Sequence, residues 1–134
     1  MARAARKKPE PVKKPDTRPV FPPTNYAVVE RILTDFIARE VRRVGLDRVV
    51  VGLSGGVDSA VSAALAARAL GPANVLAVMM PYKASSPESL ADARTVAKSL
   101  KVETLVVEIT EQIDAYYARF PDASDRRRGN KMAR

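Results

Sequence analysis

The sequence predicts an α/β protein built on an open, parallel β-sheet, and two patterns support this. Three short apolar runs, at residues 48–53, 75–80 and 102–109, have the length and β-branched content of buried strands. The segments between them have the three- and four-residue apolar spacing of helices. Strands that alternate with helices form parallel sheets with right-handed crossovers. Three strands make only half of a doubly wound domain, so we expect an incomplete sheet.

Positive charge is concentrated at the two ends of the chain. The 134 residues carry a net charge of +8, of which residues 1–20 contribute +5 and residues 122–134 contribute +3. The balanced middle shows no nucleic-acid footprint, so no specific nucleic-acid partner is expected. Residues 1–24 are basic, rich in proline and poor in apolar side chains, which predicts a disordered tail. A solvating extension is favoured over an arm that contacts RNA, DNA or an acidic partner.

Cysteine and histidine are both absent from the sequence. Ser-His-Asp and Cys-His catalysis and the usual zinc sites are therefore impossible with these residues alone. No apolar run is as long as a membrane span, and the basic N-terminus lacks the apolar core of a secretory signal, so no membrane partner is expected. Without cysteine there is no disulfide framework, and a cytoplasmic location is expected.

The first predicted helix covers residues 25–44. Its apolar stripe comprises Val29, Ile32, Leu33, Phe36, Ile37, Val41 and Val44. Charged side chains fill the other face, and Gly45 fits the stop position. We expect most of the stripe to pack in the core.

A strand, a tight turn and a helix start follow one another at 48–59. The two adjacent glycines of the turn permit positive φ and let backbone N–H groups approach a ligand. A helix start presents unpaired N–H groups that attract phosphate, and a carboxylate there can bind Mg²⁺. The predicted phosphate-binding residues are Ser54, Gly55, Gly56, Val57, Asp58 and Ser59, with Asp58 as the metal ligand.

Glycines between a strand and a helix are common in α/β proteins, so a plain turn is the alternative interpretation. The strand–turn–helix context favours a phosphate site. The turn is not a Walker A loop, because no Gly-Lys-Ser/Thr follows, and it lacks the Gly-x-Gly-x-x-Gly spacing of dinucleotide folds. The helix that it opens is apolar almost all round up to Leu70, so we expect it to be well buried.

The later elements place further candidates at strand ends. Met79 and Met80 end the second strand, where ligands of open α/β sheets bind, and core packing and adenine contact are equally plausible roles for them. Ser86 and Pro87 predict the N-cap and first residue of a helix that runs to about residue 100. Thr110 is the expected N-cap of a last short helix.

Ser-Gly-Gly-Val-Asp-Ser at 54–59 resembles the PP-loop of the ATP pyrophosphatases, which cleave ATP between its α and β phosphates. Two further segments resemble NAD synthetases within that superfamily. One is Met-Pro-Tyr-Lys-Ala-Ser-Ser-Pro-Glu-Ser at 80–89, followed by Asp92-Ala93; the other is Gly-Asn-Lys-Met-Ala-Arg at 129–134. Three matches in the correct order are specific, and they span residues 25–134.

The resemblance implies a Rossmann-like, three-layer parallel sheet of the adenine nucleotide α hydrolase kind. In a doubly wound sheet the phosphate loop should follow the central strand, where the strand order reverses, and we expect the strands on the other side of that point to be missing here. It implies ATP and Mg²⁺ as cofactors, deamido-NAD and ammonia as substrates, and a homodimer whose contact includes part of the first helix. Met79, Met80, Ser85 and Ser86 would contact ATP, and Asn130 and Arg134 would contact the acid substrate. The ammonia-dependent form is the best match, since no glutaminase domain is attached.

Members of that family are roughly twice as long as this chain. We therefore expect residues 25–134 to be the N-terminal half of such an enzyme, inactive by itself. Two other interpretations stay open. The chain is either part of another amidating enzyme of the superfamily, such as GMP synthetase, or a half-domain kept for interaction with a partner, since an exposed sheet edge needs covering.

Overall fold

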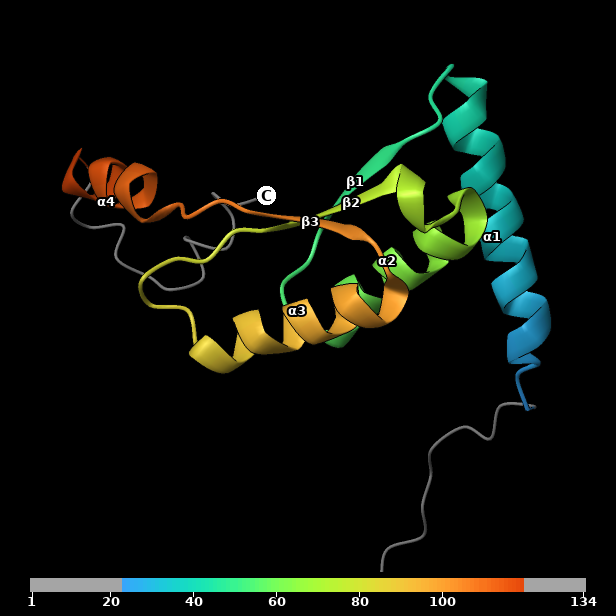
Figure 1. Cartoon of the computed structure of the whole chain (residues 1–134), viewed down its shortest axis with the longest axis horizontal. Coiled ribbons are helices and arrows are strands. Elements are labelled where there is room, and N and C mark those ends of the chain that lie inside the picture. The colour runs from blue at the N-terminus through green and yellow to red at the C-terminus, as the bar shows by residue number, and fades with distance from the viewer. Residues whose placement is uncertain (1–22, 120–134) are drawn as a thin grey trace, which may run out of the picture.

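The computed structural model describes residues 23–119, which form a three-stranded parallel sheet with four α-helices (Figure 1). The order along the chain is α1 (Tyr26–Arg43), β1 (Val49–Gly52), α2 (Val57–Leu70), β2 (Val75–Met79), α3 (Pro87–Leu100), β3 (Glu103–Val106) and α4 (Thr110–Arg119), with a short 3-10 turn, η1 (Pro72–Asn74), before β2. The predicted α/β class and parallel strands are confirmed. Each strand is shorter than predicted. Residues 1–22, which hold most of the predicted tail, lie outside the described residues.

The strand order is β1-β2-β3, with Val50 opposite Leu76 and Leu76 opposite Glu103. Among the described strands β2 is central and β1 is at an edge. All the other described strands lie on one side of β1, as expected if the strands on the other side of the phosphate loop are missing from this half of the domain. The place of the loop after the central strand of a complete sheet stays a prediction.

The core lies between one face of the sheet and the helices α2 and α3, which lie side by side beneath it (Figure 1). Small residues let the layers approach closely, and the fully enclosed ones include Ala63 of α2, Ala77 of β2 and Ala97 of α3. On the other face Val50 and Leu105 are 67% and 48% exposed. Residues 49–106 therefore supply two layers of the expected three-layer arrangement.

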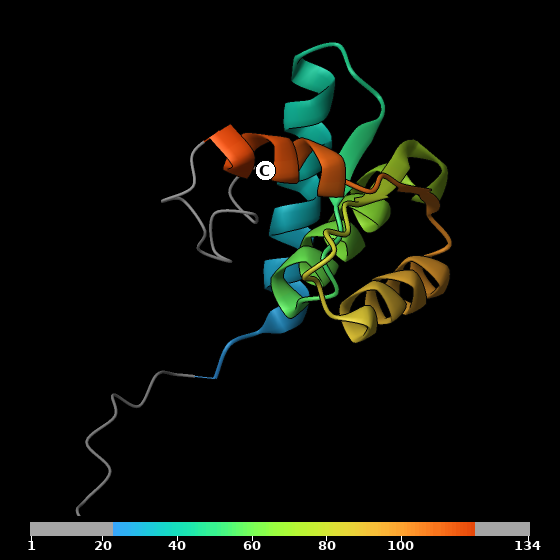
Figure 2. The same ribbon diagram turned by 90° about the vertical axis from the view of Figure 1, so that its left-hand side faces the viewer.

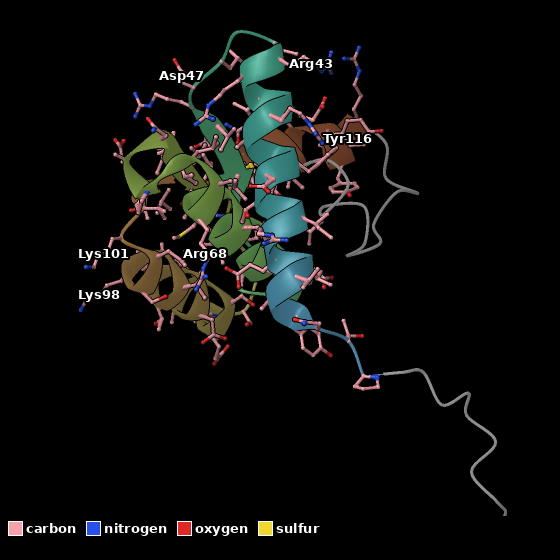
Figure 3. All side chains as sticks on the ribbon, turned by 90° about the vertical axis from the view of Figure 1, so that its right-hand side faces the viewer. Arg43, Asp47, Arg68, Lys98, Lys101 and Tyr116 are labelled. Atoms are coloured by element: carbon pink, nitrogen blue, oxygen red, sulfur yellow. The ribbon has the colours of Figure 1, made fainter. Side chains whose placement is uncertain are left out.

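The first helix departs from the expectation of core packing. None of its residues is buried, and Ile32 and Phe36 are 59% and 50% exposed. The reason is its position, since α1 crosses the sheet's edge and packs mainly against α2, where Arg68 pairs with Glu30 (Figure 3). The helix begins at an Asn25 cap and ends before Gly45, whose φ of +76° confirms the predicted stop.

The second helix is also less buried than its apolar sequence predicts. Its buried residues are Ala63, Ala66 and Ala67, whereas Val57 and Val61 near its start are 73% and 52% exposed. The sheet, α3 and α1 cover α2 along the rest of its length, whereas its first turns stay exposed. No helix in the described part of the chain is long and apolar enough to cross a membrane.

The last helix, α4, lies at the opposite end of the sheet from α1 and is nearest the viewer in Figure 2. Ile113 is its buried residue. Thr110 is the first helical residue, so its prediction as an N-cap is wrong. Its hydroxyl instead bonds outside the helix, to the Glu108 carboxylate and to the backbone N–H of Lys83.

Candidate functional site

The turn after β1 is built by hydrogen bonds among its own residues. The Ser59 hydroxyl donates to the carbonyl of Gly56 at 2.9 Å and accepts from the backbone N–H of Ser54 at 3.2 Å. The two serine hydroxyls lie 3.1 Å apart, and the Gly56 N–H donates to Ser54 Oγ at 3.4 Å. Because the single Ser59 proton is used on Gly56, Ser54 is the donor between the hydroxyls. The network fixes the backbone of the turn.

Gly55 is the position at which the turn requires glycine. Its φ is +84°, and a Cβ atom there would overlap the carbonyl oxygen of Ser89 and lie 3.0 Å from its carbonyl carbon. The absent side chain lets the turn rest on the first turn of α3. The starts of α2 and α3, which are 30 residues apart in sequence, are thereby held together at the carboxyl ends of the strands.

The start of α2 has no side-chain cap. Asn25 caps α1 by accepting from the N–H of Val28, and Ser86 caps α3 by accepting from the N–H of Ser89, but Gly56 at the start of α2 has no side chain that could do so. The first amides of a helix need partners, and the positive end of the helix dipole favours negative ones. This helix start therefore fits an anion.

Asp58 is exposed in the first turn of α2. Within residues 23–119 no group of three or more acidic, histidine or cysteine side chains could hold a metal ion. A Mg²⁺ ion at this position would take one oxygen from Asp58 and the others from phosphate and water, which suits an ion that keeps several water ligands. The residues present fit such a shared site.

The two methionines at the end of β2 differ. The Met79 side chain is 1% exposed and belongs to the core, so core packing describes its side chain. Met80 is partly exposed, and its terminal methyl lies 3.8 Å from where a Cβ on Gly52 would be. It therefore borders the end of β1, and adenine contact stays a prediction for Met80.

The two serines of the next loop bond to backbone groups. Ser85 Oγ accepts from the N–H of Tyr82 at 3.2 Å, and the N–H of Ser85 donates to the Tyr82 carbonyl at 2.7 Å. Ser86 is the predicted N-cap of α3, which is confirmed. The pKa of Glu88 is lowered, mainly by a hydrogen bond from the backbone N–H of Glu88 itself and to a smaller extent by one from the Ser86 hydroxyl. Asn130 and Arg134, predicted to bind the acid substrate, lie outside the described residues.

Sequence reasoning missed a polar cluster between the β2–α3 loop and α4. The Tyr82 hydroxyl and the Lys83 ammonium both donate to the carboxylate of Asp114. Tyr82 and Lys83 lie 32 and 31 positions before Asp114, and no local motif connects them to it. Only the parallel pairing of β2 and β3, which places the carboxyl ends of both strands side by side, could have suggested that Tyr82 and Lys83 lie close to Asp114.

These features together define a class of protein. A parallel α/β sheet whose first strand leads through a glycine turn into an uncapped helix start has the arrangement of α/β proteins that bind a phosphate group at the carboxyl ends of their strands.

The chain belongs to the NAD synthase family, because a family model described as NAD synthase matches residues 28–134. The ammonia-dependent NAD⁺ synthetases of Trichlorobacter lovleyi and Chlorobaculum tepidum are both 54% identical over 110 residues, or 82% of this chain. The chain spans 40% of the length of each of these relatives.

Solved structures give the same family. The ammonia-dependent NAD synthetase of Campylobacter jejuni, in complex with nitrate, matches 72% of this chain and 42% of its own at 35% identity and a TM-score of 0.67. The glutamine-dependent NAD⁺ synthetase of Acinetobacter baumannii, in complex with ADP, matches 83% of this chain and 21% of its own, with 31% identity and a TM-score of 0.70.

Proposed function

We propose that residues 25–134 are the ATP pyrophosphate-binding half of an enzyme that amidates nicotinic acid adenine dinucleotide to NAD with ammonia. The observation that carries this proposal is the uncapped start of α2, which follows a turn fixed by Ser54 and Ser59. The printed names of the relatives supply the reaction, and the turn supplies a place for the pyrophosphate end of ATP.

The proposed reaction has two steps. The substrate carboxylate attacks the α-phosphorus of ATP, the bond to the bridging oxygen breaks, and pyrophosphate leaves. Ammonia then attacks the carbonyl carbon of the adenylate, loses a proton, and displaces AMP to form the amide. A carboxylate is a poor electrophile, and the adenylate supplies the leaving group that makes the second step possible.

The residues of this chain would act mainly by electrostatics. The backbone N–H groups of the turn and of the α2 start would hold the negative charge that builds on pyrophosphate. Mg²⁺, when bound, neutralises charge on the phosphate oxygens, and Asp58 would be its protein ligand. Met80 would border the adenine, with Ser85 and Ser86 on the loop beside it. Asn130 and Arg134 would orient the acid substrate.

The assembly and location of the chain are also proposals. We propose a cytoplasmic homodimer, and the exposed Ile32 and Phe36 on α1 support an apolar contact on that helix. A second candidate function, a half-domain kept for a partner, is favoured by β1, whose outer side pairs with no described strand. A stable, monomeric chain in analytical ultracentrifugation would contradict both proposals.

The metal-ligand role is tested by Asp58→Asn, which keeps the shape of the side chain and removes its charge. Calorimetry of the intact 134-residue chain should show Mg-ATP binding that weakens by about tenfold or more in the variant, as expected for loss of a metal-binding carboxylate. Asp47→Asn is the matched control, because Asp47 is an exposed carboxylate before β1, at the other end of that strand (Figure 3). Equal affinities for the chain and Asp58→Asn would overturn the assignment.

A further inference from the structure

The loop between β2 and α3 is attached to α4 by one carboxylate. Asp114 accepts from the Tyr82 hydroxyl on Oδ1, at 3.0 Å, and from the Lys83 ammonium on Oδ2. Both oxygens of the carboxylate are thus used on consecutive residues of the loop. Two donors that converge on one carboxylate define both the position and the rotation of the segment that carries them.

Hydrogen bonds donated by backbone N–H groups join the same two segments. The N–H of Lys83 donates to Thr110 Oγ1 at 3.1 Å, and the N–H of Ile109 donates to the Pro81 carbonyl at 3.0 Å. The start of α4 and the beginning of the loop are therefore in register. Asp114, one helical turn further along α4, adds the side-chain contacts to this pair.

Electrostatics favour the charged forms of this cluster. The hydrogen bond from Lys83 lowers the pKa of Asp114, and the hydrogen bond to Asp114 raises the pKa of Lys83. The Lys83 and Asp114 side chains are nevertheless 58% and 39% exposed. Ion pairs this exposed contribute little to folding stability, so the contact serves geometry more than stability.

A continuous set of contacts runs from this cluster to the phosphate loop. Tyr82 is bonded to Ser85 in both directions, and Ser86 follows as the cap of α3. The first turn of α3 then meets Gly55 at the Ser89 carbonyl. Moving the loop would therefore displace the groups that border the proposed nucleotide site.

We infer that Asp114 is a positioning residue that holds the β2–α3 loop on α4 and thereby orders the nucleotide side of the site. The effect on nucleotide rests on the proposed function, whereas the effect on the loop does not. The hydrogen bonds of Asp114 to Tyr82 and Lys83 go to residues that are assigned neither to phosphate nor to metal.

Amide hydrogen exchange of the intact chain, measured by NMR at neutral pH, tests the anchoring. Asp114→Asn should leave the circular dichroism spectrum unchanged and make the amides of Lys83 and Ser85 exchange about tenfold faster, because the loop opens more often. Glu111→Gln, which neutralises an exposed carboxylate on the same helix, should leave both amides unchanged.

Tyr82→Phe provides a second test that keeps the ion pair. It should accelerate the same amides by a smaller factor, about threefold for loss of one modest hydrogen bond. Tyr117→Phe is its control, because the buried Tyr117 hydroxyl has no hydrogen-bond partner among residues 23–119. Unchanged loop amides in both Asp114→Asn and Tyr82→Phe would overturn the inference.

Mg-ATP affinity, measured on the same proteins, separates the two proposals. The inference predicts weaker binding by Asp114→Asn, about threefold or more, with affinity kept in Glu111→Gln. Faster loop exchange with unchanged ATP affinity would overturn the effect on nucleotide. If the unsubstituted chain binds no ATP while loop exchange responds to Asp114→Asn, the proposed function fails and the anchoring by Asp114 stands.

Discussion

The loops that follow β1 and β2 both lie at the carboxyl ends of the strands, but different contacts fix their positions. The turn after β1 is fixed from within, by hydrogen bonds between Ser54, Gly56 and Ser59. The loop after β2 is held from outside, by Asp114 and Thr110 of α4. A rigid turn suits the binding of one invariant group, such as phosphate, whereas a loop anchored on another element can be adjusted from a distance.

The largest effect should come from Gly55→Ala in the internally fixed turn. Positive φ and overlap with the Ser89 carbonyl act together, so we expect about 3 kcal/mol of lost stability. Urea unfolding measures this loss. Gly56→Ala is the matched control, because Gly56 has a φ of −80° and a Cβ there would lie 3.5 Å from Ser54 Oγ. Equal losses at the two glycines would contradict this account of the turn.

Ser59→Ala should have the next largest effect, because it removes the hydroxyl on which the turn's network converges. We expect a loss of about 1–2 kcal/mol in urea unfolding, since the N–H of Ser54 and the carbonyl of Gly56 lose a partner. Ser62→Ala on the same helix removes only a bond to the Asp58 carbonyl and should cost less. If Ser62→Ala costs as much as Ser59→Ala, the turn is not held by its own network.

Ser86→Ala tests the end of the second loop. Loss of the cap on α3 should reduce stability by about 1 kcal/mol, as for other N-caps. The same measurement on Asn25→Ala, which uncaps α1, gives a matched comparison. An Asn25→Ala loss with no loss in Ser86→Ala would show that the α3 start is held by its contact with Gly55 instead.

The smallest effect should be the pH dependence of the contact between Asp114 and the β2–α3 loop. The pKa of Asp114 lies below the ordinary aspartate value of 3.8, so its contribution is present above that value and is lost as pH falls through the lowered pKa. NMR titration of the Asp114 carboxyl carbon should give a midpoint below 3.8. The midpoint should rise in Lys83→Met, since the hydrogen bond from Lys83 is the main cause of the lowering. A midpoint that Lys83→Met leaves unchanged would contradict this.

The two loops also show what the sequence could predict. The turn and helix start at 54–59 were predictable because the hydrogen bonds within the turn join residues at most five positions apart. The same holds for the Ser86 cap and for Gly45 at the end of α1. The contacts of Asp114 were not predictable, because they depend on the positions of β2, β3 and α4 together.

Burial was predicted less well than the elements themselves. An apolar stripe such as that of α1 occurs both in helices that pack in a core and in helices whose apolar side is exposed. In α1 the stripe is largely exposed, and Phe36 is 50% exposed. The pattern of a helix reveals its apolar face and leaves open what covers that face.

The central claim is that the turn at 54–59 holds the pyrophosphate end of ATP. The most direct test is an NMR titration of the isotopically labelled, 134-residue chain with Mg-ATP and, separately, with pyrophosphate and Mg²⁺. We expect both ligands to shift the amides of Gly55, Gly56 and Val57 most, and only ATP to shift residues near Met80 as well. Shifts by pyrophosphate that are largest elsewhere, or no shifts with either ligand, would contradict it.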